Sequence, residues 1–173
     1  MKKVLFLGSI MLSLLLGISS IAYAGAKKKA NKDTKNWRYD IEAAGVGTQG
    51  TYLVKVWSYS KKPKVAMEQA KKNAVHGVIF KGFVGKPGVP GQKALASSPA
   101  IEQEKQQFFD EFFADGGKYM KYVFESTAGA VAAEDRMKVG KEYKIGVVVS
   151  VNVDALRKDL EAAGVIKGLS SGF

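Results

Sequence analysis

Few side chains in this sequence could carry out nucleophilic, acid–base or metal chemistry. The chain contains one histidine, His76, and no cysteine. The lack of cysteine excludes a thiol nucleophile, a cysteine-ligated zinc site and disulfide bonds, and a single histidine excludes a multi-histidine metal site. His76 is the one imidazole that could act as a general base near neutral pH. We expect it at the C-terminus of a helix, where the helix dipole would stabilise a positive ring, and we therefore predict no catalytic residue, no metal site and no cofactor.

A glycine motif and two carboxylate clusters resemble functional sites, but the secondary structure predicted around them does not fit those functions. Residues 45–50 spell G-x-G-x-x-G, yet they precede a predicted strand, whereas phosphate binding needs the amide groups at the start of a helix. Carboxylates gather at 110–115 and at 134–135, and a carboxylate pair is the minimum for glycoside hydrolysis. Both groups fall on a predicted solvated helix face or turn, so the sequence identifies no catalytic pair.

The residues best suited to contact a ligand lie on one strand and one loop. Lys55, Trp57 and Tyr59 alternate along a predicted strand and share a face, where they could stack on a sugar or a base or pack beneath a helix. Lys86 and Lys93 lie in a long loop rich in proline and glycine, which is either functional or a mobile surface excursion. These five residues form the candidate contact surface.

The first 24 residues have the pattern of a signal peptide. Two lysines, an apolar stretch over 4–21 and an A-x-A sequence at 22–24 predict cleavage after Ala24. The mature chain of 149 residues, 25–173, has the size of one domain. It has no cysteine for a lipid anchor and no second apolar stretch that could cross a bilayer. We therefore expect an exported protein, periplasmic or secreted, or peripheral to the envelope.

The positive charge is concentrated near the new N-terminus. Of the formal net charge of +11, residues 25–38 carry +5 and residues 39–173 carry +4. Residues 25–38 could bind anionic lipid, lipopolysaccharide or nucleic acid by Coulomb attraction, or they could be a solvated flexible leader. We predict a basic flexible tail at 25–38 and a single domain at 39–173.

The elements that must position these residues alternate between strands and helices. Strands over 39–47 and 51–60 predict a hairpin, and Pro63 begins a helix with a stripe of small residues that ends at Gly77. The remaining predicted elements are a short buried strand at 78–80, a loop at 84–98, a helix at 99–115 with an aromatic face, a strand at 118–126 with Met120, Tyr122 and Phe124 on one face, a weak strand and turn within 127–140, a strand at 142–153, and a helix at 155–163 capped by Asp154. This order predicts an α+β domain, with an antiparallel-dominated sheet, two longer helices packed on one face and a short C-terminal helix.

The central stretch resembles a known module. D-x-E-A-A-G-x-G at 40–47 precedes a strand, and A-x-x-x-A-x-x-N-A at 66–74 and F-x-G-F at 80–83 follow it. This order resembles the small α+β module of bacterial envelope proteins, found in some outer-membrane lipoproteins and in the N-terminal part of a flagellar assembly protein. The resemblance covers up to half of the mature chain, which lacks the lipoprotein cysteine. It implies an interaction or assembly role and no catalytic residues.

Three functions are compatible with these observations. The first is an exported, non-enzymatic, envelope-associated module that binds another envelope protein or an envelope polymer. The alternative is a carboxylate-dependent enzyme that acts on an envelope glycan or polymer, and a third is anion or nucleic-acid binding through residues 25–38. Clustered carboxylates in a deep cleft would favour the enzyme, and scattered acids on a shallow surface would favour the binding module.

Overall fold

The computed structural model describes residues 25, 28–30, 32, 34–126 and 131–168. The predicted signal peptide, and residues 127–130 of the weakly patterned stretch, lie outside the described residues. Within the described part of the chain, no helix is long and apolar enough to cross a membrane.

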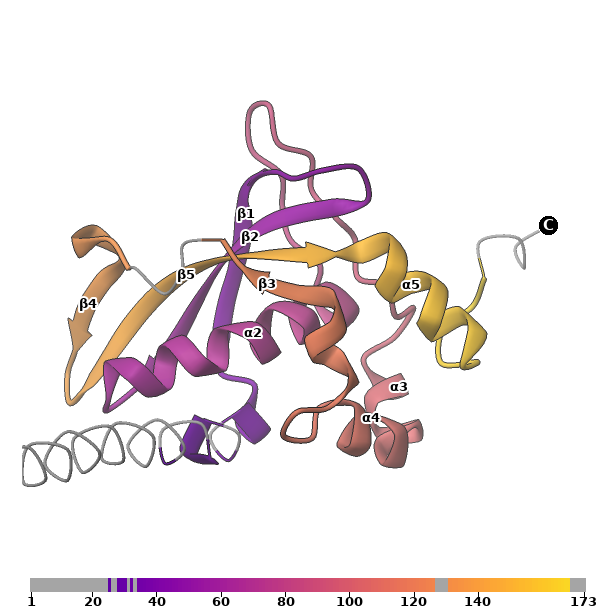
Figure 1. Cartoon of the computed structure of the whole chain (residues 1–173), viewed down its shortest axis with the longest axis horizontal. Helices are drawn as coiled ribbons and strands as arrows, with labels where there is room; N and C mark the ends of the chain where they lie inside the picture. Colours follow the sequence, from indigo (N-terminus) through magenta and orange to yellow (C-terminus); the bar gives the residue numbers. More distant parts are fainter. Residues whose placement is uncertain (1–24, 26–27, 31, 33, 127–130, 169–173) are drawn as a thin grey trace, which may run out of the picture.

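The protein has an α+β fold built on one antiparallel sheet (Figure 1). Strand order is β1-β2-β5-β3, and β4 pairs with the same edge of β5 as β3. The strands are β1 (Tyr39–Val46), β2 (Thr51–Ser60), β3 (Val123–Glu125), β4 (Arg136–Val139) and β5 (Glu142–Asn152). All four pairings between the described strands are antiparallel, which confirms the predicted hairpin and the antiparallel sheet.

The helices lie mainly to one side of this sheet (Figure 1). The α-helices are α2 (Pro63–Phe80), α3 (Ala100–Glu104), α4 (Gln106–Phe112) and α5 (Val153–Ala162). Short 3₁₀ turns occur at η1 (Thr34–Asn36), η2 (Lys118–Tyr122) and η3 (Ala133–Asp135).

Helix α2 packs across the centre of the sheet. Its stripe of Ala66, Ala70 and Ala74 is fully buried, as are Val54 and Val56 on the facing side of β2. Alanine side chains let the helix backbone approach the sheet closely, so the larger strand side chains fill the space between the two layers. The small-residue stripe is therefore the packing face that the sequence predicted.

The prediction that α2 ends at Gly77 is wrong. The helix continues to Phe80, and no strand forms at 78–80. Gly77 is instead a contact point, because a Cβ there would lie 2.7 Å from Ile41 Cδ1 of β1. The glycine that ends the helix is Gly82, which has a φ of +66° and donates its amide to the Gly77 carbonyl.

The second predicted helix is divided in two. Lys105, with φ of −111° and ψ of 30°, separates α3 from α4. The predicted aromatic face is confirmed for Phe109, Phe112 and Phe113, which are buried. The rings of Phe109 and Phe80 lie 5.0 Å apart, so this pair of short helices packs on α2.

The region predicted as a strand at 118–126 is mostly a 3₁₀ turn. Strand β3 begins only at Val123. In η2, Tyr119 and Tyr122 are both buried because residues three apart eclipse each other in a 3₁₀ helix. Met120 and Phe124 are exposed by 37% and 60%, so the predicted shared face of Met120, Tyr122 and Phe124 is wrong.

The remaining elements differ from prediction only in detail. Helix α5 begins two residues early, and its cap is the Asn152 side chain, which accepts from the Ala155 amide, rather than Asp154. The loop at 84–98 contains no helix or strand, as predicted. Isolated antiparallel bridges between Phe83 and Gln92 and between Lys86 and Val89 bring the two sides of its first part together.

Gly82 and Gly88 provide a matched test of how this loop is anchored. Both have a positive φ, of +66° and +76°. A Cβ at Gly82 would clash with the backbone of Gln92 and Ala94, whereas one at Gly88 would meet nothing within 4 Å. We expect Gly88→Ala to lower the free energy of unfolding by about 1 kcal/mol, from the backbone conformation alone, and Gly82→Ala by about 3 kcal/mol. Urea unfolding measures both, and equal losses would contradict the anchor.

Candidate functional site

The predicted trio on β2 lies on the sheet face opposite α2. Lys55, Trp57 and Tyr59 are half-buried there, while Val54 and Val56 point to the helix. The Trp57 ring lies against Gly146 of the neighbouring strand, where a Cβ would come within 2.9 Å of the ring. The strand alternation thus places the three residues together, as the sequence predicted from their spacing.

Charged groups surround the rings on this face. Lys144 Nζ lies 5.2 Å from the Trp57 ring centre and 5.4 Å from that of Tyr59, and it forms an ion pair of 2.8 Å with Asp40. This hydrogen-bonded pair lowers the pKa of Asp40 and raises the pKa of Lys144. Lys55 pairs with Asp135 at 2.7 Å. The aromatic groups are therefore engaged by the protein's own cations, which leaves them poorly available as a stacking surface.

Lys86 and Lys93 lie elsewhere. Both are exposed on the loop after α2, which is tied to the start of β2 by a ring contact of 5.6 Å between Phe83 and Tyr52. Tyr59 is seven residues further along that strand, a distance of roughly 23 Å at the usual rise per residue. The five predicted contact residues thus divide between two surfaces.

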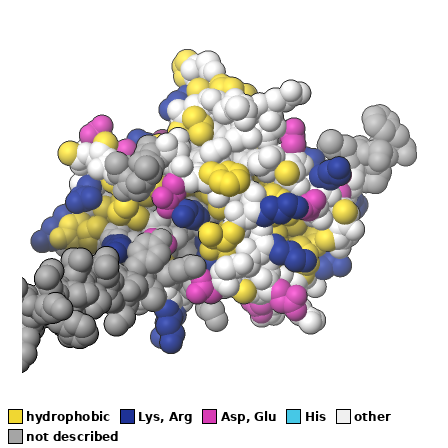
Figure 2. All heavy atoms as spheres, viewed as in Figure 1, with side chains coloured by type: hydrophobic (Ala, Val, Ile, Leu, Met, Phe, Trp, Pro, Cys, Tyr) yellow, Lys and Arg dark blue, Asp and Glu magenta, His cyan; other side chains and the backbone are white. Residues whose placement is uncertain are grey.

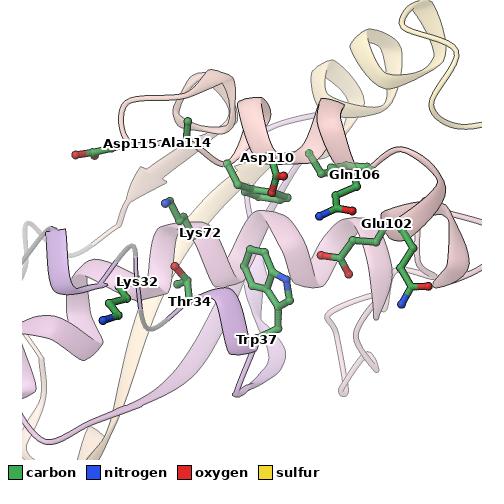
Figure 3. Close-up of a pocket in the computed structure, with 12 residues that line it drawn as sticks. Lys32, Thr34, Trp37, Lys72, Glu102, Gln106, Asp110, Ala114 and Asp115 are labelled. Carbon is green, nitrogen blue, oxygen red and sulfur yellow. The ribbon is translucent and has the colours of Figure 1, made fainter.

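A large cleft lies between the N-terminal segment, α2 and the α3–α4 pair (Figure 3). Its volume is about 1210 Å³. Trp37, Phe109 and Phe113 provide its aromatic lining. A concave site with aromatic walls and a few polar groups is typical of a ligand pocket.

Polar side chains of both signs surround the aromatic lining. Figure 3 shows Trp37 near the middle, with Glu102 and Gln106 toward one end and Lys32 and Lys72 toward the other. Thr34, Gln103, Asp110 and Asp115 complete the polar lining. In Figure 2, acidic side chains gather at the lower edge of the view, where Figure 1 places α3 and α4.

Trp37 is held in a strained position by a buried histidine. Its φ of 43° is in the left-handed region, which non-glycine residues rarely occupy. The indole stacks on the His76 imidazole with ring centres 3.6 Å apart and planes inclined by 17°. The rings of Phe113 and Trp37 meet edge-to-face, with ring centres 5.1 Å apart. Strain of this kind persists where the surroundings fix the conformation, and it is concentrated at functional sites.

His76 is itself fixed through both ring nitrogens. Nδ1 lies 2.6 Å from the Tyr39 hydroxyl, and Nε2 lies 3.1 Å from a carboxylate oxygen of Glu102. Because an ionised carboxylate can only accept, Nε2 carries the proton and Nδ1 accepts from Tyr39. The expectation of a helix-terminal, positively charged His76 is wrong, because α2 continues past it and the ring is only 3% exposed.

Burial decides the protonation of this network. It lowers the pKa of His76 below its ordinary value, although the hydrogen bond to Glu102 acts in the opposite direction. Burial also raises the pKa of the Tyr39 hydroxyl, and the nearby Glu102 carboxylate raises it further. The imidazole is therefore neutral and the phenol protonated, so neither is available as a strong base or as a phenolate nucleophile.

The acids of the cleft are spread along it. Among the described residues, no three His, Cys, Asp or Glu side chains are placed to hold one metal ion. The carboxylate of Glu102 is committed to His76, while Asp110 and Asp115 lie at other points of the lining. This arrangement can position a ligand by hydrogen bonds from several sides.

The sequence did not identify this cleft. Trp37 lies within residues 25–38, which we expected to be a flexible tail, and Glu102 is 26 residues from its partner His76. The useful signal was the combination of a tryptophan just before β1 and a lone histidine in α2, the longest of the described helices.

Comparisons of the chain with protein-family models, with curated proteins and with solved structures find no match.

The state of His76 predicts how stability depends on pH. Since its pKa is lower in the folded protein, the unfolded chain binds a proton that the folded chain does not. Stability should be constant above about pH 6.5, the ordinary histidine pKa, and should fall as the pH drops toward the folded-state pKa. The limiting slope is about 1.4 kcal/mol per pH unit. Denaturant unfolding between pH 8 and 5 measures it.

His76→Gln is the control for that experiment. Because the chain has a single histidine, the variant should lose most of the slope between about pH 6.5 and 5.5, where carboxylates of ordinary pKa are still almost fully ionised. The same slope in both proteins would show that another group is responsible.

Proposed function

We propose that this protein is an exported, non-enzymatic binding module of the cell envelope that holds a glycan in the Trp37 cleft. The observation that carries the proposal is the strained indole, stacked on a buried neutral imidazole and lining a cleft of about 1210 Å³. A ring fixed in this way requires little further ordering when a ligand stacks on it.

The cleft's chemistry favours a saccharide among envelope polymers. Sugars combine apolar C–H faces, which pack on aromatic rings, with hydroxyl groups that both donate and accept hydrogen bonds. Gln103 and Gln106 offer amides, and Asp110 offers an acceptor. Three carboxylates and two lysines line the cleft, so its charge is nearly balanced and favours a ligand without strong net charge.

Binding accounts for these side chains better than catalysis does. The imidazole that could act as a general base has both nitrogens occupied, and burial keeps it neutral. The export part of the proposal rests on the signal-peptide pattern of residues 1–24, and the envelope part on the resemblance of residues 40–83.

Two neighbouring pairs on α4 test the proposal. Gln106 and Asp110 line the cleft, whereas Gln107 and Glu111 lie beside them on the same helix, exposed and outside the lining. We expect Gln106→Ala and Asp110→Ala each to weaken glycan binding about 10-fold, equivalent to roughly 1.4 kcal/mol. Gln107→Ala and Glu111→Ala should have little effect. Calorimetric titration of the mature chain with fragments of purified envelope glycans measures the affinities.

The outcome is decided by the contrast within each pair. Equal effects at lining and non-lining positions, or no saturable binding to any envelope glycan, would contradict the proposal. Because all four side chains lie on the surface of one short helix, thermal unfolding of each variant provides a check that the fold is unchanged.

The second candidate is a carboxylate-dependent enzyme that acts on the same glycan. The occurrence of Glu102, Asp110 and Asp115 in one cleft favours it. New reducing ends released by the mature chain, and lost in Glu102→Gln, would support the enzyme. Binding without release of reducing ends would support the binding module.

A further inference from the structure

The loop after α2 and the turn between β1 and β2 lie together at one end of the molecule. Figure 1 shows the loop projecting at the top of the view, beside that turn. A ring contact of 5.6 Å between Phe83 and Tyr52 joins the loop to β2, and Tyr52 lies opposite Val46 in the strand pairing. Residues 46–50 and 83–93 are together called the loop end.

The side chains exposed at the loop end are apolar or basic. Val84 is 86% exposed, more than any other large aliphatic or aromatic side chain in the described part of the chain, and Val46 is 62% exposed. Lys86 and Lys93 are exposed on the same loop. Figure 2 shows hydrophobic side chains and a basic group at the top of the view, where Figure 1 places the loop. Exposed apolar groups rimmed by charged ones mark a surface that contacts a partner.

Acidic residues are absent from both segments of the loop end. The sequence has no Asp or Glu between Glu42 and Glu68, nor between Glu68 and Glu102. One carboxylate from elsewhere, that of Asp154, lies against Gly50 of the hairpin turn. The two lysines outnumber it, so the loop end has a net positive charge and complements an anionic partner.

The loop is held in one shape by its own backbone. Phe83 and Gln92 exchange two backbone hydrogen bonds with N–O distances of 2.8 and 3.0 Å, and Lys86 and Val89 exchange two more of 2.9 and 2.8 Å. Backbone groups that are already paired cost less to move out of water than unpaired ones. The loop can therefore enter the boundary between water and lipid without refolding.

We propose that the loop end docks on an anionic phospholipid surface, with Val84 among the lipid headgroups and Lys86 and Lys93 against their phosphates. The residue types favour lipid over a protein partner. Protein interfaces are enriched in Trp, Tyr and Arg and depleted in Lys, whereas residues 84–93 contain two lysines and none of those three. Lysine is attracted to an anionic bilayer by its charge, while its aliphatic stem packs on apolar groups.

Docking through the loop end leaves the Trp37 cleft open. Helices α3 and α4, which line the cleft, lie at the bottom of Figure 1, and the loop lies at the top. A protein held at the bilayer by its loop end would thus direct the cleft away from the lipid. The docking does not depend on what the cleft binds.

The absence of cysteine allows a direct test of which part meets the lipid. Val84→Cys and Val139→Cys each introduce one thiol for a fluorophore whose emission shifts to the blue in apolar surroundings. Val139 is 48% exposed on β4, outside the loop end. With vesicles of phosphatidylglycerol and phosphatidylethanolamine, we expect a blue shift at position 84 and none at position 139. Equal shifts, or no shift at position 84, would overturn the proposal.

Lysine pairs of equal charge separate local docking from the general attraction of a basic protein. Lys86→Ala/Lys93→Ala removes two charges from the loop end, and Lys138→Ala/Lys141→Ala removes two from exposed positions on β4 and the turn after it. In sedimentation with the same vesicles, we expect the first pair to weaken binding about 25-fold, from roughly 5-fold per lysine, and the second less than about 3-fold. Equal losses would overturn the proposal.

Other partners of the loop end give different results. Lys28→Ala/Lys32→Ala should keep most of the vesicle binding, and a loss confined to that pair would assign the contact to the N-terminal segment instead. A blue shift at position 84 that grows with protein concentration in the absence of vesicles would identify a second copy of the chain. Either result would overturn the proposal. The loop variants should bind glycan like the natural chain, so failure of docking and failure of glycan binding are separate outcomes.

Discussion

The hydrogen bonds of a single buried imidazole connect three separate parts of the chain. His76 on α2 bonds to Tyr39 on β1 and to Glu102 on α3, and Trp37 stacks on its ring. A buried polar group is costly when unpaired, so this position tolerates little rearrangement of its partners. The edge strand, the central helix and the α3–α4 pair are thereby fixed relative to one another, and the cleft forms between them.

The two tryptophans, on opposite sides of the sheet, differ in what packs against their rings. Opposite α2, Trp57 is surrounded by Lys144, Lys55 and Gly146, so its ring is used in packing and cation–π contacts. On the helix side, one face of Trp37 is taken by the imidazole and the residue remains partly exposed in the cleft. The two tryptophans of the chain thus have different roles, which follow from what lies against each ring.

Most of the fold could be predicted from the sequence, and most of the site could not. The hairpin and β5 follow from strict alternation of apolar residues, a local signal. Gly77 was misinterpreted because the sequence does not show whether a glycine ends a helix or permits close packing. The 3₁₀ turn at 118–122 was predicted as a strand because, over five residues, apolar side chains three apart are hard to distinguish from side chains that alternate. Trp37 and Glu102 are brought into one site by their contacts with His76. These are tertiary contacts, which the spacing of residues in the sequence does not predict.

The most direct test of the account is the ¹⁵N NMR spectrum of the His76 side chain, which is unambiguous because the chain has one histidine. Neutral imidazole tautomers differ in which nitrogen carries the proton, and the two nitrogens then resonate far apart. We predict a proton on Nε2 of the neutral ring, an unprotonated Nδ1, and a titration midpoint below the ordinary histidine pKa of about 6.5, since burial lowers the pKa. A ring that titrates with the ordinary pKa of about 6.5, or that carries its neutral-state proton on Nδ1, would contradict the network.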